Sequence, residues 1–204
     1  MNREQTLMKK RLFVAIELPE KLKNEIALYQ QAIVKDLDVQ PRLTAKENLH
    51  VTVSFLDTIE ESYIPGLIEQ LKDVTPEVSP FTLQYESTIF GPPGRFSSMI
   101  WIVYEPSNEF THLLREINGK VVTYLKKYSQ PVLLSSHQEP VPHITLARFK
   151  DKIQTIQTSF APFSTKDLSV SSYTLMHSQL SPKGPTYASI ETYELIRTPQ
   201  LHNE

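Results

Sequence analysis

The sequence contains no cysteine among its 204 residues. Disulfide bonds, thiolate metal sites and cysteine nucleophiles are therefore excluded for this chain. An excess of positive charge is also absent, because 21 Lys and Arg against 23 Asp and Glu give a formal net charge of −2. Proteins that wrap a long nucleic acid usually carry a basic surface. Any nucleic acid is therefore expected to be contacted locally, at an end or over a few nucleotides.

Long apolar runs and metal-binding motifs are missing too. The only apolar run near the start, residues 12–16, is closed by Glu17 and Pro19, which is too short for a secretory signal or a membrane span. We expect a cytoplasmic protein that does not bind a membrane. His-Glu-x-x-His, His-x-His and acidic clusters are all absent, so we predict no metal site and no cofactor. Two prolines between Gly91 and Gly94 remove the amide donors that a phosphate-cradling loop needs.

The apolar pattern alternates between strand and helix periods. Strands are predicted over residues 11–18, 47–56, 81–90, 99–104, 142–149, 163–176 and 186–195. Helices are predicted over residues 22–33, 63–71 and 110–125. Many neighbouring strands are joined by turns too short for a crossover, so they pair antiparallel and the fold class is α+β. We expect one domain over residues 1–204, with an ordered core at about 11–197 and a loose tail at 198–204.

One tripeptide step occurs twice, each time inside an apolar strand. His50-Val51-Thr52 lies in the second predicted strand, and His143-Ile144-Thr145 lies in the fifth. Residues two apart in a strand face the same way, so each histidine projects together with its threonine. Strict alternation places Val53 and Phe55 in the core with Val51. The repetition suggests two similar lobes, each of which contributes one strand to a shared centre.

Two imidazoles and two hydroxyls in one pocket suit phosphoryl chemistry without a metal ion. Opening a cyclic phosphate needs a base to activate water and an acid to protonate the leaving ribose oxygen. Histidine can hold either proton state near neutrality. The threonine hydroxyls can donate to the non-bridging oxygens of the phosphate. We therefore predict that His50, Thr52, His143 and Thr145 form the catalytic group.

The two histidine strands resemble those of the two-histidine (2H) phosphoesterase superfamily. Within it, the sequence is most similar to the RNA 2′,3′-cyclic phosphodiesterases, also called 2′-5′ RNA ligase-like proteins. The similarity extends in family order over residues 11–16 with Leu18-Pro19, 47–56, 90–93 with Trp101, 142–148, and Gly184-Pro185 with Tyr187. The sequence departs from the family pattern at Asp57, where a glycine is usual, and at Leu43, where a tryptophan is usual. These two departures put the substrate range in doubt.

The resemblance implies a bilobal, pseudo-two-fold (LigT-like) fold, with antiparallel sheets that line a central cleft and helices outside. It implies a hydrolase of RNA processing that opens a terminal 2′,3′-cyclic phosphate to a 2′-phosphate without a metal ion. His50 would be the proton donor to the leaving 3′ oxygen, and His143 the acceptor of the proton from water. Arg148 would contact the nucleotide, although alternation places it opposite His143 unless the strand bulges.

Aromatic residues could stack on a base. Phe13 and Tyr187 are candidates for substrate binding, whereas Phe55 and Trp101 are expected in the core. We assign no catalytic role to the remaining histidines, which are His112, His137, His177 and His202.

Three functions remain open from the sequence. The first is the RNA 2′,3′-cyclic phosphodiesterase described above, acting as a monomer on RNA ends or short oligonucleotides. The second is a phosphodiesterase for 2′-5′ oligonucleotides or small cyclic phosphates, with the same chemistry and a different pocket. The third is a non-catalytic module that binds RNA ends. The intact pair of His-x-Thr steps favours an enzyme.

Overall fold

The computed structural model describes residues 8–35, 37–130, 141–154, 160–163, 167–181 and 184–196. The predicted tail at 198–204 lies outside these ranges. The strands are β1 (Lys9–Glu17), β2 (Arg42–Leu43), β3 (His50–Glu60), β4 (Phe81–Leu83), β5 (Tyr85–Gly91), β6 (Phe96–Tyr104), β7 (His143–Gln154), β8 (Leu168–Val170), β9 (Ser172–Ser181) and β10 (Gly184–Glu194). The helices are α1 (Glu20–Val34), α2 (Ile64–Lys72) and α3 (Asn108–Lys126), with 3₁₀ turns at Lys46–Asn48 and Glu61–Tyr63. Within the described part of the chain, no helix is long and apolar enough to cross a membrane.

Two antiparallel half-sheets meet along a narrow seam. The strand order is β10-β9-β1-β3-β7-β6-β5, with β2 paired to β7. The seam between β3 and β7 consists of one residue pair, Val51 opposite Ile144, among the described residues. All the pairings are antiparallel, which confirms the predicted α+β class. We call the part with β1, β3, β9 and β10 the first half-sheet and the part with β2, β5, β6 and β7 the second.

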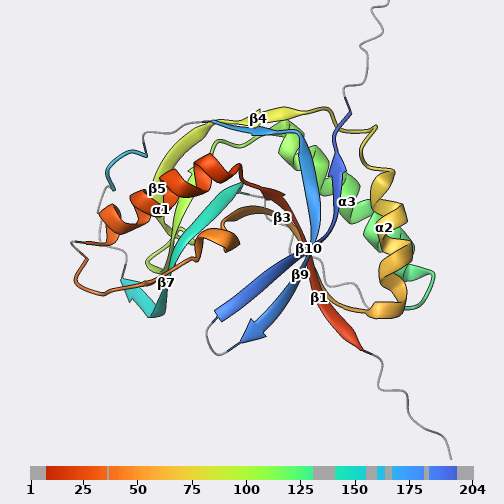
Figure 1. Cartoon of the computed structure of the whole chain (residues 1–204), viewed down its shortest axis with the longest axis horizontal. Coiled ribbons are helices and arrows are strands. Elements are labelled where there is room, and N and C mark those ends of the chain that lie inside the picture. Colours follow the sequence, from red (N-terminus) through yellow and green to blue (C-terminus); the bar gives the residue numbers. More distant parts are fainter. Residues whose placement is uncertain are drawn as a thin grey trace, which may run out of the picture.

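Each half-sheet is covered by a helix that the chain brings from the other half (Figure 1). Helix α1 follows β1, but its buried Gln30 donates to the carbonyl oxygen of Leu146 in β7 at 2.6 Å. Helix α3 follows β6, but its Asn118 accepts from the hydroxyl of Ser54 in β3 at 2.6 Å. Ser107 starts α3 as its N-cap, because its hydroxyl accepts from the backbone N–H of Phe110.

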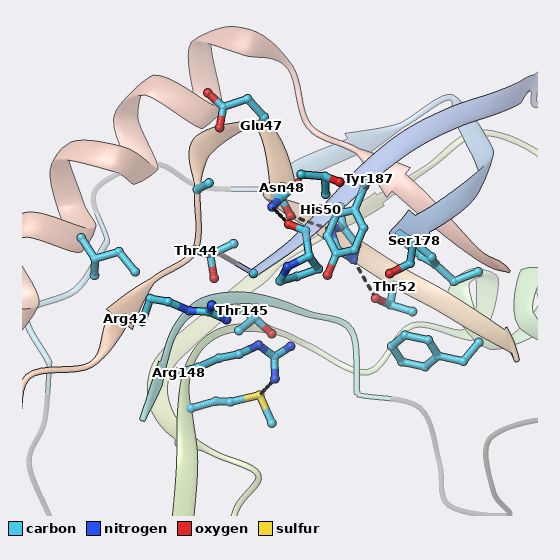
Figure 2. A pocket seen from close by; sticks show the side chains of 18 of the residues that line it. Arg42, Thr44, Glu47, Asn48, His50, Thr52, Thr145, Arg148, Ser178 and Tyr187 are labelled. Carbon is cyan, nitrogen blue, oxygen red and sulfur yellow. Dashed lines mark hydrogen bonds between the residues drawn. The ribbon is translucent and has the colours of Figure 1, made fainter. Parts of the chain in front are cut away.

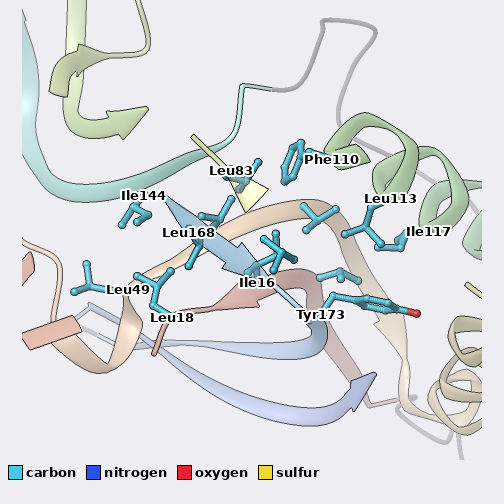
Figure 3. Packing of buried hydrophobic residues seen from close by; sticks show 14 of the residues in the cluster. Ile16, Leu18, Leu49, Leu83, Phe110, Leu113, Ile117, Ile144, Leu168 and Tyr173 are labelled. Atoms are coloured by element: carbon cyan, nitrogen blue, oxygen red, sulfur yellow. The ribbon is translucent and has the colours of Figure 1, made fainter. Parts of the chain in front are cut away.

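The main apolar core runs through both halves (Figure 3), beside a small separate cluster of Phe13, Ala15 and Met176. Ile16 and Leu49 from the first half pack in the same cluster as Ile144 from the second. Leu83 of β4 and Leu168 of β8 belong to it as well, so the small two-stranded β4–β8 sheet closes the core from outside. Burial of these side chains supplies the main favourable free energy of folding.

Several predicted strand boundaries were wrong. The predicted strand at 81–90 is divided into β4 and β5, and the one at 163–176 is reduced to β8 and β9. The reason is that β4 and β8 leave the large sheet to pair with each other, which an apolar pattern does not reveal. The predicted strand at 47–56 begins only at His50, because residues 46–48 form a 3₁₀ turn.

Candidate active site

Both histidine strands contain a β-bulge at the same position. In β3, Val53 is the extra residue between the pairs Val14–Ser54 and Ala15–Thr52. In β7, Leu146 is the extra residue between the pairs Ile100–Ala147 and Trp101–Thr145. Each bulge lies three residues after the histidine that starts its strand. A bulge adds one residue to one strand, so it reverses which face the following side chains occupy.

The reversal places Phe55 and Arg148, each five residues after its histidine, on the same face as His50 and His143. Both side chains line the central cavity. The expectation that Phe55 packs in the core was wrong, since its side chain is 48% exposed. The structure meets the condition stated for Arg148, because the bulge at Leu146 brings it to the cavity.

The cavity has a volume of about 830 Å³. All seven residues that the sequence singled out line it, from both half-sheets: His50, Thr52, His143, Thr145, Arg148, Phe13 and Tyr187. Figure 2 shows Thr145 and Arg148 on one side, and Thr52 and Tyr187 on the other. The cleft expected between antiparallel sheets is therefore present.

The two imidazoles are held in the same way. His50 Nδ1 donates to the carbonyl oxygen of Asn48 at 2.7 Å, and His143 Nδ1 donates to that of Val141 at 2.8 Å. Because a carbonyl oxygen only accepts, this bond fixes the proton on Nδ1 and leaves Nε2 as the acceptor in the neutral ring. His50 Nε2 accepts from the hydroxyl of Thr52 at 3.0 Å.

Burial disfavours the charged form of both rings. It lowers the pKa of His50 to about 4, helped by repulsion from His143 and Arg148 and opposed by the bond to Asn48. Burial also lowers the pKa of His143, again with help from Arg148 and opposed by the bond to Val141. In the free protein at pH 7, the His50 imidazole is therefore neutral.

His143 stacks on Trp101, with ring centroids 3.9 Å apart and an interplanar angle of 23°. Trp101 is buried, as expected, but it also lines the cavity. Its ring packs against Gly91, where an added Cβ would lie 2.3 Å from the nearest indole carbon, Cδ2. Gly91 therefore provides the space that lets Trp101 support His143.

Aromatic side chains surround His50 instead. The Phe13 ring centroid lies 5.1 Å from that of His50 and 5.0 Å from that of Tyr187, and Tyr187 meets His50 edge-on at 5.2 Å. Phe13 is buried, so the rings available to a base at this end are those of Tyr187 and Phe55. The cavity thus has an aromatic end at the first half-sheet.

Several cavity residues were missed by the sequence reasoning. Arg42 lies on the two-residue strand β2, Arg11 on β1, and Asn48 donates to the carbonyl oxygen of Pro185 at 2.8 Å. Strand β2 has only two residues, which is too short for an alternating pattern, so the sequence could not show that Arg42 lies in a strand.

The two departures from the family pattern have different consequences. Asp57 has a φ of 60°, in the left-handed region that glycine favours and Asp tolerates. It is not among the residues of the central cavity, whereas Leu43 is. Leu43 is therefore the departure that can affect the substrate.

The other described histidines lie away from this cavity. His112 contacts the carbonyl oxygen of Glu77 on the outside of α3, and His177 lies at a shallow groove beside Lys10. His137 and His202 lie outside the described residues. In the described ranges, no group of three or more His, Asp or Glu side chains is arranged to hold a metal ion.

Known proteins are similar to this chain in sequence. The model of the 2′-5′ RNA ligase superfamily matches residues 18–180. A Methanocaldococcus jannaschii protein named RNA 2′,3′-cyclic phosphodiesterase is 30% identical over 195 residues, covering 90% of this chain and 99% of that protein. A Methanothermobacter thermautotrophicus protein of the same name is 26% identical over 193 residues, covering 92% of this chain and all of that protein.

Solved structures agree in fold. Escherichia coli LigT complexed with 3′-AMP has a TM-score of 0.73 at 20% identity, covering 92% of this chain and 99% of LigT. A Thermus thermophilus protein has a TM-score of 0.73 at 24% identity, covering 91% of this chain and 97% of that protein. Because the superfamily model matches most of this chain, the chain belongs to the 2′-5′ RNA ligase superfamily of two-histidine phosphoesterases.

Proposed function

We propose that this protein is an RNA 2′,3′-cyclic phosphodiesterase that opens cyclic phosphate ends to 2′-phosphates by acid–base catalysis without a metal ion. The observation that carries the proposal is the matched setting of His50 and His143. Each ring has its Nδ1 fixed on the carbonyl oxygen two residues earlier, and both rings line one cavity. Curated relatives with this name align over about 90% of the chain.

In the proposed reaction, a water oxygen forms a bond to phosphorus while the bond from phosphorus to the 3′ oxygen breaks. His143 Nε2 takes the proton from water, and His50 gives a proton to the leaving 3′ oxygen, as the family resemblance implies. Exchange of protons with solvent then restores both rings. Thr52 and Thr145 donate to the non-bridging oxygens, whose charge must be stabilised in the transition state.

The low pKa of His50 is compatible with a role as the acid only if bound substrate raises that pKa. A cyclic phosphate carries a negative charge, and an opposite charge within about 4–6 Å favours the protonated imidazole. Binding of the phosphate next to His50 thus supplies the proton-holding form that burial disfavours in the free protein. The Thr52 hydroxyl, which bonds His50 Nε2 in the free protein, would turn to the phosphate.

The cavity is assembled from one chain, so we propose a monomer that acts on RNA ends or short oligonucleotides. Cytoplasmic localisation stays a prediction from the sequence. The chain's net charge of −2 supports contact with a short segment rather than a long duplex.

The decisive experiment follows an oligonucleotide that ends in a 2′,3′-cyclic phosphate and maps the product by mass analysis and 3′-end chemistry. The wild type is expected to give a 2′-phosphate and to retain its activity in excess EDTA. His50→Ala and His143→Ala should each lower kcat by about 10²- to 10⁴-fold, since each removes one proton-transfer group. Circular dichroism checks that both variants stay folded.

Other outcomes would separate the alternatives. Turnover of a 2′-5′ oligoadenylate or a small cyclic nucleotide, but not of the cyclic RNA end, would indicate a related phosphodiesterase. Binding of the cyclic end with no turnover would indicate a non-catalytic module. A loss of activity in EDTA that a divalent ion restores would contradict the metal-free mechanism, and near-normal rates in either alanine variant would make that histidine structural.

A further inference from the structure

Two arginines stand side by side at the end of the cavity opposite the aromatic rings. Arg42 of β2 is directly opposite Arg148 of β7 in the antiparallel register, so their side chains share one face. Both line the cavity, and Figure 2 shows them with Thr145 between them. Like charges placed directly opposite each other repel, so this arrangement costs stability unless an anion binds there.

Neither guanidinium forms a salt bridge with a carboxylate of the described residues. Among the described residues, the salt bridges of the chain involve Lys10, Lys46, His112, Lys72 and Lys120, and none involves Arg42 or Arg148. Arg148 Nη1 lies 2.8 Å from the sulfur of Met99, which is a weak acceptor. The Arg42 Nη1 would lie 2.7 Å from a Cβ added to Gly184, so its side chain reaches the start of β10.

The charged side chains that line the cavity therefore carry a net positive charge, although the chain as a whole is slightly negative. Its lining includes the three arginines Arg11, Arg42 and Arg148 against one carboxylate, Glu47, on a chain with a net charge of −2. A positive cleft on an acidic protein indicates a ligand with more than one negative charge, because the two histidine–threonine steps already account for one phosphate.

The spacing along the strand fits a second phosphate. Thr145 pairs with Trp101 and Arg148 pairs with Met99, so the two positions are separated by two steps on β6, or roughly 7 Å at the usual rise of a strand. This is comparable with the separation of successive phosphates along a nucleic-acid strand. The second anion would thus belong to the neighbouring nucleotide position.

The chemistry of the substrate gives the direction. In a ribonucleoside 2′,3′-cyclic phosphate, the base is attached to C1′, and C4′ carries the C5′ group that bears the 5′ oxygen. C1′ and C4′ flank the ring oxygen. A base against Tyr187 and Phe55 at the aromatic end directs the 5′ oxygen toward Arg42 and Arg148. The group attached there in an RNA chain is the internucleotide phosphate.

We propose that Arg42, next to Arg148, binds the phosphate on the 5′ side of the terminal nucleoside and makes the enzyme prefer RNA ends to free cyclic nucleosides. Arg42 is thus a specificity-determining residue, and the inference rests on the proposed function. Guanidinium groups bind phosphate through two parallel N–H donors, which suits this position better than a lysine would.

The test compares adenosine 2′,3′-cyclic phosphate with the same compound carrying a 5′-phosphate, so that the substrates differ only at the group in question. For the wild type, kcat/KM should be higher with the 5′-phosphate by about 10- to 100-fold, the range for one charge-assisted hydrogen bond. The variant Arg42→Gln should reduce this ratio to within about threefold of one, and Arg42→Lys should give an intermediate ratio. Arg42 is exposed, so the substitutions leave the core untouched.

Arg11→Gln is the matched control, because it removes the same charge from the same cavity on the side of the first half-sheet, where Arg11 is level with Tyr187 through Ser178. It should keep the wild-type ratio, and a dinucleotide with a cyclic end should follow the 5′-phosphate in every variant. A wild-type ratio near one, an unchanged ratio in Arg42→Gln, or an equal loss in Arg11→Gln would each overturn the inference while leaving the proposed function intact. Failure of the wild type to hydrolyse the two mononucleoside compounds and the dinucleotide with a cyclic end would overturn both.

Discussion

Replacing Gly91 by alanine tests the support beneath His143. The added Cβ would lie 2.3 Å from the nearest indole carbon of Trp101, whereas carbon atoms in contact are about 3.5–4.0 Å apart. The ring must therefore retreat by roughly 1.2–1.7 Å. Trp101 is buried and stacked on His143 at 3.9 Å, so it cannot retreat without disturbing the imidazole.

Two quantities should change in Gly91→Ala. Overpacking of this size costs about 1–3 kcal/mol, which for a chain of this length lowers Tm by roughly 2–12 °C. Displacement of a catalytic group by about 1 Å can lower the rate about 100-fold, so we expect kcat to fall by about 10- to 100-fold. Thermal unfolding by circular dichroism gives the first quantity, and steady-state hydrolysis of a cyclic-ended oligonucleotide gives the second.

Gly119→Ala serves as the control. Gly119 lies on the exposed side of α3, and an added Cβ meets nothing within 4 Å. The same substitution there should stabilise the helix by about 0.5–1 kcal/mol and leave kcat unchanged. If Gly91→Ala matches the wild type in Tm, the close packing of Trp101 is wrong. If Tm falls while kcat does not, the stack on His143 has no part in catalysis.

The remaining predictions concern the imidazoles and the hydroxyls. Because burial lowers the pKa of both His50 and His143, kcat/KM should be bell-shaped with its maximum below pH 6.5 and should fall as the pH rises above the higher of the two pKa values. The maximum of kcat should lie at higher pH, since the bound phosphate favours the protonated ring; a flat profile from pH 5 to 8 would contradict the acid–base pair. Thr52→Val and Thr145→Val keep the side-chain shape and remove a donor to the phosphate, so each should lower kcat by about 10- to 1,000-fold. Rates within threefold of the wild type in single-turnover assays would show that the hydroxyls do not stabilise the transition state.

The predictable part of the site was the part that local spacing controls. His-x-Thr in a strand puts the ring and the hydroxyl on one face, whatever the rest of the fold does. The repetition of this step indicated two related strands, and the structure places both histidines on one cavity. The residues that follow could not be placed, because the bulges at Val53 and Leu146 are set by pairing with β1 and β6.

Phe55 illustrates that limit. Alternation counted from His50 assigns it to the core, but one unpaired residue at Val53 turns it to the cavity. Arg42 illustrates a second limit of prediction from sequence. Its place beside Arg148 follows from a two-residue pairing between segments about a hundred positions apart, which local spacing does not reveal. Trp101 was correctly expected to be buried, but the stack on His143 depends on the space above Gly91, which no periodic pattern records.

The exchange of helices between the half-sheets affects how the chain can be divided. Helix α1 bonds to the backbone of β7 through Gln30, and α3 bonds to β3 through Asn118. A fragment that ends before β4 would keep β1 and β3 but lack α3, and its apolar surface would meet water. We expect such halves to be insoluble alone and to recover a native fold when expressed together, because each half depends on a helix from the other.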